Sequence, residues 1–121
     1  MEDKIFTTKQ NSNDIKTYVD KLYNLNHKKI DKNCDINFEF DIYLIDSTIS
    51  DVILTLTNKI YEVSQNKIFY FKDFKGISEN NNIIINGNGI SIDNKDFHII
   101  SKNYKTVRLI FLKEEKMWIT L

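Results

Sequence analysis

Apolar and polar residues alternate over the ten residues from Ile36 to Ile45. Positions 36, 38, 40, 42 and 44 are large and apolar, whereas positions 37, 39 and 41 are polar or acidic. A strand places alternate side chains on opposite faces, so this pattern predicts one strand with a dry face and a wet face. Such strands are typical of antiparallel sheets. We predict that Phe38 and Phe40 point into the protein, whereas Glu39 and Asp41 point out.

A helical spacing marks residues 13–25. Ile15, Tyr18, Val19 and Leu22 follow the i, i+3, i+4, i+7 pattern, which places them on one face of a helix. The polar and basic residues that follow, as far as position 35, predict a connector. One N-terminal amphipathic helix is therefore expected over about 13–25.

The middle of the chain predicts a meander of strands. Val52–Thr57 and Ile60–Ser64 flank Asn58-Lys59, and a tight hairpin there sets apolar residues opposite each other. A second tight turn at Gln65-Asn66 leads into a strand that starts near Ile68. The apolar faces stay in phase across all three strands.

Two hairpins are predicted in the second half. Gly87-Asn88-Gly89 separates the runs 83–86 and 90–92, and Asn and Gly tolerate the positive φ that hairpin turns need. A further turn is expected around Asp93–Asp96. Val107–Leu112 and Met117–Leu121 form the last hairpin, apolar on both faces, so we expect the helix to lie across it.

These elements predict a single α+β domain over residues 1–121. The N-terminal amphipathic helix, at about 13–25, packs on a strongly bent, mainly antiparallel meander sheet over about 36–121. The expected architecture is a half-barrel or two-layer roll of about eight or nine strands.

Composition narrows the class of protein. The 121 residues carry no net charge and include a single Arg, which argues against nucleic-acid binding. The lone Cys34 excludes an intramolecular disulfide and favours a reducing compartment. No apolar run is long enough for a membrane span and no secretory leader is visible, so a cytoplasmic protein of the producing or infected cell is expected. The excess of Ile, Asn and Lys suggests an AT-rich genome, such as that of a low-GC bacterium or its phage.

No motif commits the chain to a catalytic chemistry. His27, His98 and Cys34 do not have the spacing of a metal site. The Gly87–Gly89 segment precedes a predicted strand and not a helix, so it is interpreted as a turn and not as a phosphate loop. Glu114-x-Lys116 matches a nuclease element only in spacing. We therefore predict no enzyme, no cofactor and no metal site.

The distribution of acidic residues provides the one candidate site. Residues 36–66 contain one Lys and five acids, a net charge of −4. With the aromatic Tyr43 on the same outward face as Glu39, these acids are interpreted either as a solvated sheet face or as an acidic docking face with an aromatic anchor. The candidate partner-binding residues are Glu39, Asp41, Tyr43, Asp46, Asp51 and Glu62.

The leading functional hypothesis is a small protein-binding inhibitor. An immunity protein or a phage-encoded anti-defence protein fits one compact domain with an acidic face, and its partner would be a basic nucleic-acid-handling enzyme. Two alternatives remain open: a β-barrel-like protein that binds a small ligand, and a viral structural or assembly protein. Exposed strand edges also leave a homodimer open.

Overall fold

The computed structural model describes residues 26–62 and 66–121, with Tyr61 described only by its backbone. These residues form nine strands and one short 3-10 helix. In chain order the elements are β1 (His27–Ile30), β2 (Cys34–Ile36), β3 (Ile42–Ile45), β4 (Val52–Leu56), η1 (Asn58–Glu62), β5 (Lys67–Asp73), β6 (Ile83–Asn86), β7 (Phe97–Ile100), β8 (Thr106–Leu112) and β9 (Met117–Thr120).

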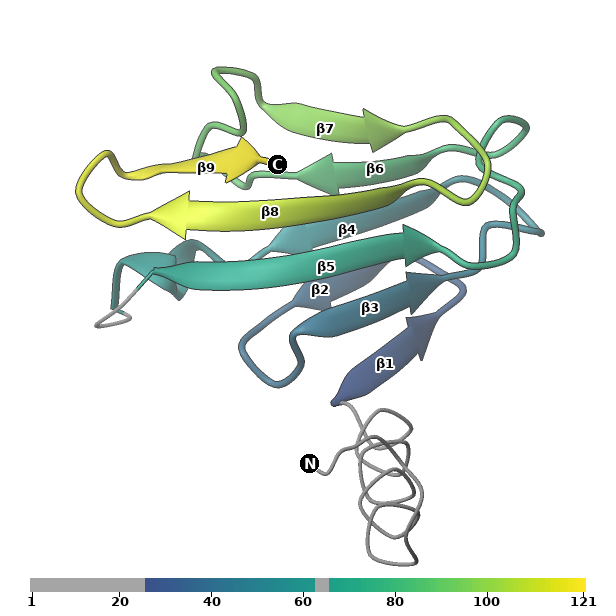
Figure 1. Cartoon of the computed structure of the whole chain (residues 1–121), viewed down its shortest axis with the longest axis horizontal. Coiled ribbons are helices and arrows are strands. Elements are labelled where there is room, and N and C mark those ends of the chain that lie inside the picture. Colours follow the sequence, from purple (N-terminus) through teal and green to yellow (C-terminus); the bar gives the residue numbers. More distant parts are fainter. Residues whose placement is uncertain (1–25, 63–65) are drawn as a thin grey trace, which may run out of the picture.

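The first six strands alternate between two sheets. β1, β3 and β5 lie side by side in one sheet, β2, β4 and β6 in the other, and all neighbours in these two sets are parallel. Each successive pair of strands therefore makes one turn around a shared interior, as in a β-helix. Figure 1 shows the two sets stacked, with β1, β3 and β5 running to the right and β6 running to the left.

The last three strands complete the sheets in the antiparallel sense. β7 pairs with β6, β8 with β5 and β9 with β8, which gives the orders β1-β3-β5-β8-β9 and β2-β4-β6-β7. An isolated bridge between Ile92 and Trp118 then links the β6–β7 connection to β9. The two sheets are thus joined along one side of the molecule.

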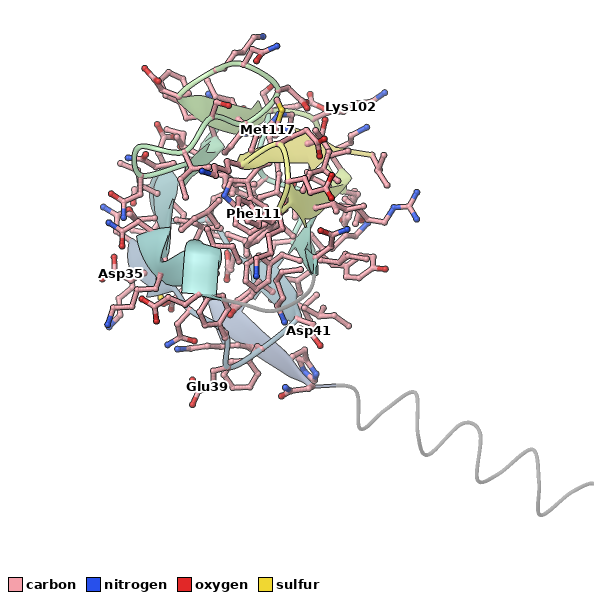
Figure 2. All side chains as sticks on the ribbon, turned by 90° about the vertical axis from the view of Figure 1, so that its left-hand side faces the viewer. Asp35, Glu39, Asp41, Lys102, Phe111 and Met117 are labelled. Atoms are coloured by element: carbon pink, nitrogen blue, oxygen red, sulfur yellow. The ribbon has the colours of Figure 1, made fainter. Side chains whose placement is uncertain are left out.

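The core lies between the two sheets and is rich in aromatic rings. The ring of Trp118 stacks on Phe69 at 5.6 Å and meets the edge of Phe111 at 5.2 Å, and all three side chains are fully buried. Tyr43 stacks on Phe71 at 5.5 Å. Figure 2 shows Phe111 in the interior, surrounded by other side chains. Such pairs add stability beyond their buried area.

The predicted α+β class is wrong. The structure is mostly β, with two mixed sheets, and the described residues include no helix of seven residues or more. The helix predicted over 13–25 lies outside the described residues. The mainly antiparallel meander is also wrong, because period-two alternation reports that one face of a strand is buried and not the direction of its neighbours.

The predicted strand over 36–45 is two strands in different sheets. β2 ends at Ile36, residues 37–41 turn, and β3 begins at Ile42. After the turn, the odd-numbered residues and not the even-numbered ones face the core: Tyr43 is 2% exposed, whereas Ile42 is half-buried on the outer face. The alternation therefore continued across a turn by coincidence, and it placed Tyr43 on the wrong face.

The meander between 52 and 73 is replaced by a crossover. β4 and β5 belong to different sheets, and residues 58–62 form η1, in which Ile60 is fully buried. The apolar residues of the predicted 60–64 strand are thus explained in part by one buried helical side chain.

The two later hairpins have different outcomes. β8 and β9 pair antiparallel around residues 113–116, so the last hairpin is confirmed. The Gly87–Gly89 segment is a turn, but β6 pairs with β7 and not with residues 90–92. Instead, Asp93 and Asn94, both with positive φ, form a tight turn between Ile92 and Lys95. Residues on the outer face of the last hairpin, such as Ile110 and Ile119, are half-buried.

Candidate protein-binding turn

The six predicted site residues do not form one surface. Glu39, Asp41 and Glu62 lie at the end of the molecule where β2 and β4 finish, on the left in Figure 1. Asp46 and Asp51 lie at the opposite, right end, in the connection from β3 to β4.

Two of the predicted site residues, Tyr43 and Glu62, lie in surroundings that differ from the predicted ones. Tyr43 belongs to the core, and burial raises its pKa to about 12. It cannot serve as a surface anchor. Glu62 is exposed in η1, which takes the place of the hairpin predicted around Asn58-Lys59.

Two of the three predicted site residues at the left end, Glu39 and Asp41, lie on the turn formed by residues 37–41, here called the acidic turn. Glu39 and Asp41 are both exposed, and Figure 2 shows them projecting from the lower side of the molecule, away from the core. Sequence reasoning placed the same carboxylates in solvent, but on a sheet face. The structure places them on a turn between two strands of different sheets.

Hydrogen bonds hold the backbone of the acidic turn from several sides. Within the turn, the N–H of Glu39 donates to Asn37 Oδ1 at 2.8 Å. The side chain of Asn26 donates to the carbonyl of Glu39 at 2.9 Å, and the Tyr43 hydroxyl donates to the carbonyl of Asn37 at 3.4 Å. The turn is therefore tied to the chain before β1 and to the core.

Asp41 anchors the far side of the turn. Its carboxylate forms an ion pair with Lys67, at the start of β5, and its carbonyl accepts the N–H of Tyr70 at 2.8 Å. The ammonium of Lys67 also lies 5.2 Å from the ring centre of Phe69. In the described part of the chain, Glu39 has no such ion pair, so its charge is directed to solvent.

The two phenylalanines of the turn have different environments. Phe40 packs against the core, edge-on to Tyr43 at 6.2 Å. Phe38 is 39% exposed. The turn thus presents one aromatic ring and one unpaired carboxylate next to each other. Sequence reasoning missed Phe38, because continued alternation placed it inside, and no other signal in the sequence marks it.

The acids at the right end stabilise loops. Asp46 accepts the N–H of Thr48 at 2.9 Å, and its hydrogen bonds to Thr48 lower the pKa of its carboxyl group. Asp51 accepts the N–H of Asn82 at 2.8 Å. A shallow hollow of about 240 Å³ beside Asp46 is lined by Lys29, Ile30, Asp31, Asp46 and Phe74. Both acids have local structural partners that the acidic turn's Glu39 does not have.

The described residues contain no cluster of side chains that could hold a metal ion. No group of three His, Cys, Asp or Glu side chains converges there. Cys34 is in β2 and His27 in β1, which belong to different sheets. The Sγ of Cys34 donates to the carbonyl of Asp35 at 3.2 Å.

Comparison with known proteins does not assign the chain to a family. No protein-family model matches it, and a search of curated proteins finds no match. In residues 26–62 and 66–121, no helix is long and apolar enough to cross a bilayer.

Proposed function

We propose that this protein acts by binding another protein, as a small inhibitor of the immunity-protein or phage anti-defence type. The contact is made by the acidic turn, and the partner is a basic protein such as a nucleic-acid-handling enzyme. This proposal moves the docking surface from a sheet face to a turn, and it replaces Tyr43 by Phe38 as the aromatic anchor.

One observation supports the proposal above all: the backbone of the acidic turn is fixed by hydrogen bonds, whereas the side chains of Phe38 and Glu39 are exposed and have no ion-pair or ring partner among the described residues. A turn fixed by hydrogen bonds from Asn26 and Tyr43 loses little conformational entropy when a partner binds. Exposed aromatic rings such as Phe38 supply much of the energy of small interfaces. The carboxylate of Glu39 favours a basic partner, and complementary charge speeds association.

The small-ligand alternative has less support. The side chains between the two sheets are almost completely buried. The hollows at the surface are open and shallow, and the one described above is bordered by charged residues.

Affinity purification followed by calorimetry tests the proposal. The tagged protein is used to retain partners from the cells that produce it, and each retained protein is purified and titrated with wild type, Phe38→Ala, Glu39→Lys and Asp51→Lys. We expect the two turn variants to weaken binding by roughly tenfold or more, equivalent to about 1.4 kcal/mol. Asp51→Lys, at the opposite end, is the matched control and should bind as wild type does.

Two results contradict the proposal. Equal affinity of the turn variants and the wild type removes the acidic turn as the contact. Failure to retain any protein at micromolar concentrations contradicts the inhibitor function itself.

A further inference from the structure

β7 is an open sheet edge with apolar side chains. Among the described strands it pairs only with β6, and it is the outermost strand of the four-stranded sheet, at the top of Figure 1. On its outer face Phe97 is 49% exposed and Ile99 is 43% exposed. Proteins usually protect such edges with charges, prolines or covering segments, because an open apolar edge invites another strand.

The other three edge strands of the described sheets are protected. The free side of β9 is taken by residues 91–93, since Trp118 N–H donates to Ser91 and Asp93 N–H donates to Trp118. β1 carries Lys28 and Lys29, and β2 is only three residues long. β7 is therefore the edge that is open, apolar and long enough to pair.

The hydrogen bonds to β6 fix which groups of β7 are available. Gly87 N–H donates to the carbonyl of Asp96 at 3.0 Å, and Gly87 lies opposite Asp96 in the register of the β6–β7 pair. In an antiparallel pair such hydrogen-bonded positions alternate with non-hydrogen-bonded ones. Asp96, His98 and Ile100 thus direct their backbone groups to β6. Phe97 and Ile99 direct theirs to the open edge.

We propose that a second copy of this chain pairs with β7, antiparallel across a two-fold axis at Ile99. Each Ile99 then exchanges two backbone hydrogen bonds with its counterpart, and Phe97 pairs in the same way with Ser101 of the other copy. Three hydrogen-bonded pairs give about six new backbone hydrogen bonds. The two four-stranded sheets become one continuous sheet, in the isologous arrangement usual for homodimers.

The charges beside β7 are complementary in this register. Asp96 lies opposite Lys102 of the other copy, twice by symmetry, in non-hydrogen-bonded positions where side chains approach most closely. Both residues are exposed, and Figure 2 shows Lys102 on the upper side of the molecule, the side on which β7 lies. No ion pair to either side chain exists among the described residues.

The apolar side chains are complementary as well. Ile53, Ile84 and Ile99 are neighbours in one row across the outer face of β4, β6 and β7. The two-fold axis at Ile99 continues this row into the second copy. A register centred on His98 instead sets His98 opposite itself and Asp96 opposite Ile100, with about four backbone hydrogen bonds. The register at Ile99 is therefore favoured by its opposite charges, by its continuous apolar row and by its larger number of backbone hydrogen bonds.

Analytical ultracentrifugation of charge variants tests the dimer. The wild type should sediment at twice the 14.4 kDa of one chain at micromolar concentration. Lys102→Asp places like charges opposite each other twice and should raise the dimer Kd by roughly tenfold. The double variant Asp96→Lys, Lys102→Asp restores the opposite charges and should restore dimerisation. A wild type that is monomeric at 100 μM, or a double variant no better than the single one, overturns the proposal.

A cysteine pair tests the register without depending on stability. In a Cys34→Ser background, Ile99→Cys sets two thiols opposite each other, about 5.5 Å apart at Cα, within the range of a disulfide. Phe97→Cys is the matched control: it is equally exposed on the same strand, but the two copies lie too far apart. Oxidation should cross-link the Ile99→Cys chain only. Equal cross-linking of both variants, or of neither, overturns the register.

Discussion

Asp73 is the buried carboxylate that organises the right end of the molecule. It lies at the end of β5 and is fully buried. Its Oδ1 accepts the N–H of Gly76 at 2.9 Å, and its Oδ2 accepts those of Ser78 at 3.0 Å and Tyr104 at 3.1 Å. Burial alone would raise the pKa of Asp73, but the hydrogen bonds from the backbone N–H groups of Ser78 and Tyr104 outweigh burial, and the pKa is lowered. One side chain thus fixes two loops.

Asp73→Asn should lower the free energy of unfolding by about 3 kcal/mol, because the amide leaves two buried backbone N–H groups facing a donor instead of an acceptor. Urea denaturation measures the change. The control is Asp51→Asn at the same end of the molecule, where the single hydrogen bond to Asn82 can be kept by the amide oxygen. A loss in Asp73→Asn no larger than that in Asp51→Asn would contradict this role.

His98 makes the stability sensitive to mild acid. It lies on the inner face of β7, and burial lowers its pKa below the usual 6.5, with Asp93 opposing the shift and Lys95 and Lys105 adding to it. As the pH falls through 6.5, the unfolded chain binds a proton before the folded chain does, so stability is lost. Above that pH the group contributes no pH dependence.

The melting temperature of the wild type should therefore fall between pH 7.5 and 5.5, and the fall should be smaller in His98→Gln. Differential scanning fluorimetry across this pH range provides the comparison. The same slope in wild type and His98→Gln would be evidence against the assignment.

At the scale of elements, the connection from β6 to β7 depends on one glycine more than on the other. A Cβ on Gly87 would lie 2.0 Å from the carbonyl oxygen of Ile90, whereas Gly89 has open space at this position. Gly89 has a φ of +90°, so its substitution meets only backbone strain.

Gly87→Ala should cost about 3 kcal/mol of unfolding free energy, because backbone must move to admit the methyl group. Gly89→Ala should cost about 1 kcal/mol from its left-handed backbone. Chemical denaturation of the two variants side by side gives the order. A smaller loss for Gly87→Ala than for Gly89→Ala would show that this turn is not as tight as described.

The elements also show how far the sequence can predict this fold. The β8–β9 hairpin was predictable, because its strands are adjacent in sequence and one polar turn joins them. β2 and β3 were merged, because the residues of the acidic turn happen to continue the alternation. The parallel pairs β1–β3 and β2–β4 join residues that are separated by a strand of the other sheet. Local periodicity carries no information on such partners, and Tyr43 and Phe38 were misplaced for the same reason.

At the scale of the whole molecule, each sheet depends on the other, because successive strands alternate between the two sheets. From β1 to β6 the chain changes sheet after every strand, so neither sheet corresponds to a continuous segment of the chain. The inner faces of both sheets share one core, and the Ile92–Trp118 bridge joins them again at one side. Loss of one sheet removes the partner that covers the other, so partial unfolding leaves a large apolar face in water.

Unfolding should therefore be one cooperative transition. Trp118 is the single tryptophan and is fully buried in the core that the two sheets share, so its fluorescence reports the packing of one sheet on the other. Far-ultraviolet circular dichroism reports the strands of both sheets. The two signals should give the same urea midpoint and the same slope, as two-state unfolding requires. Different urea midpoints for the two signals would show that one part of the structure can unfold while another stays folded, and the interdependence inferred from the strand order would be wrong.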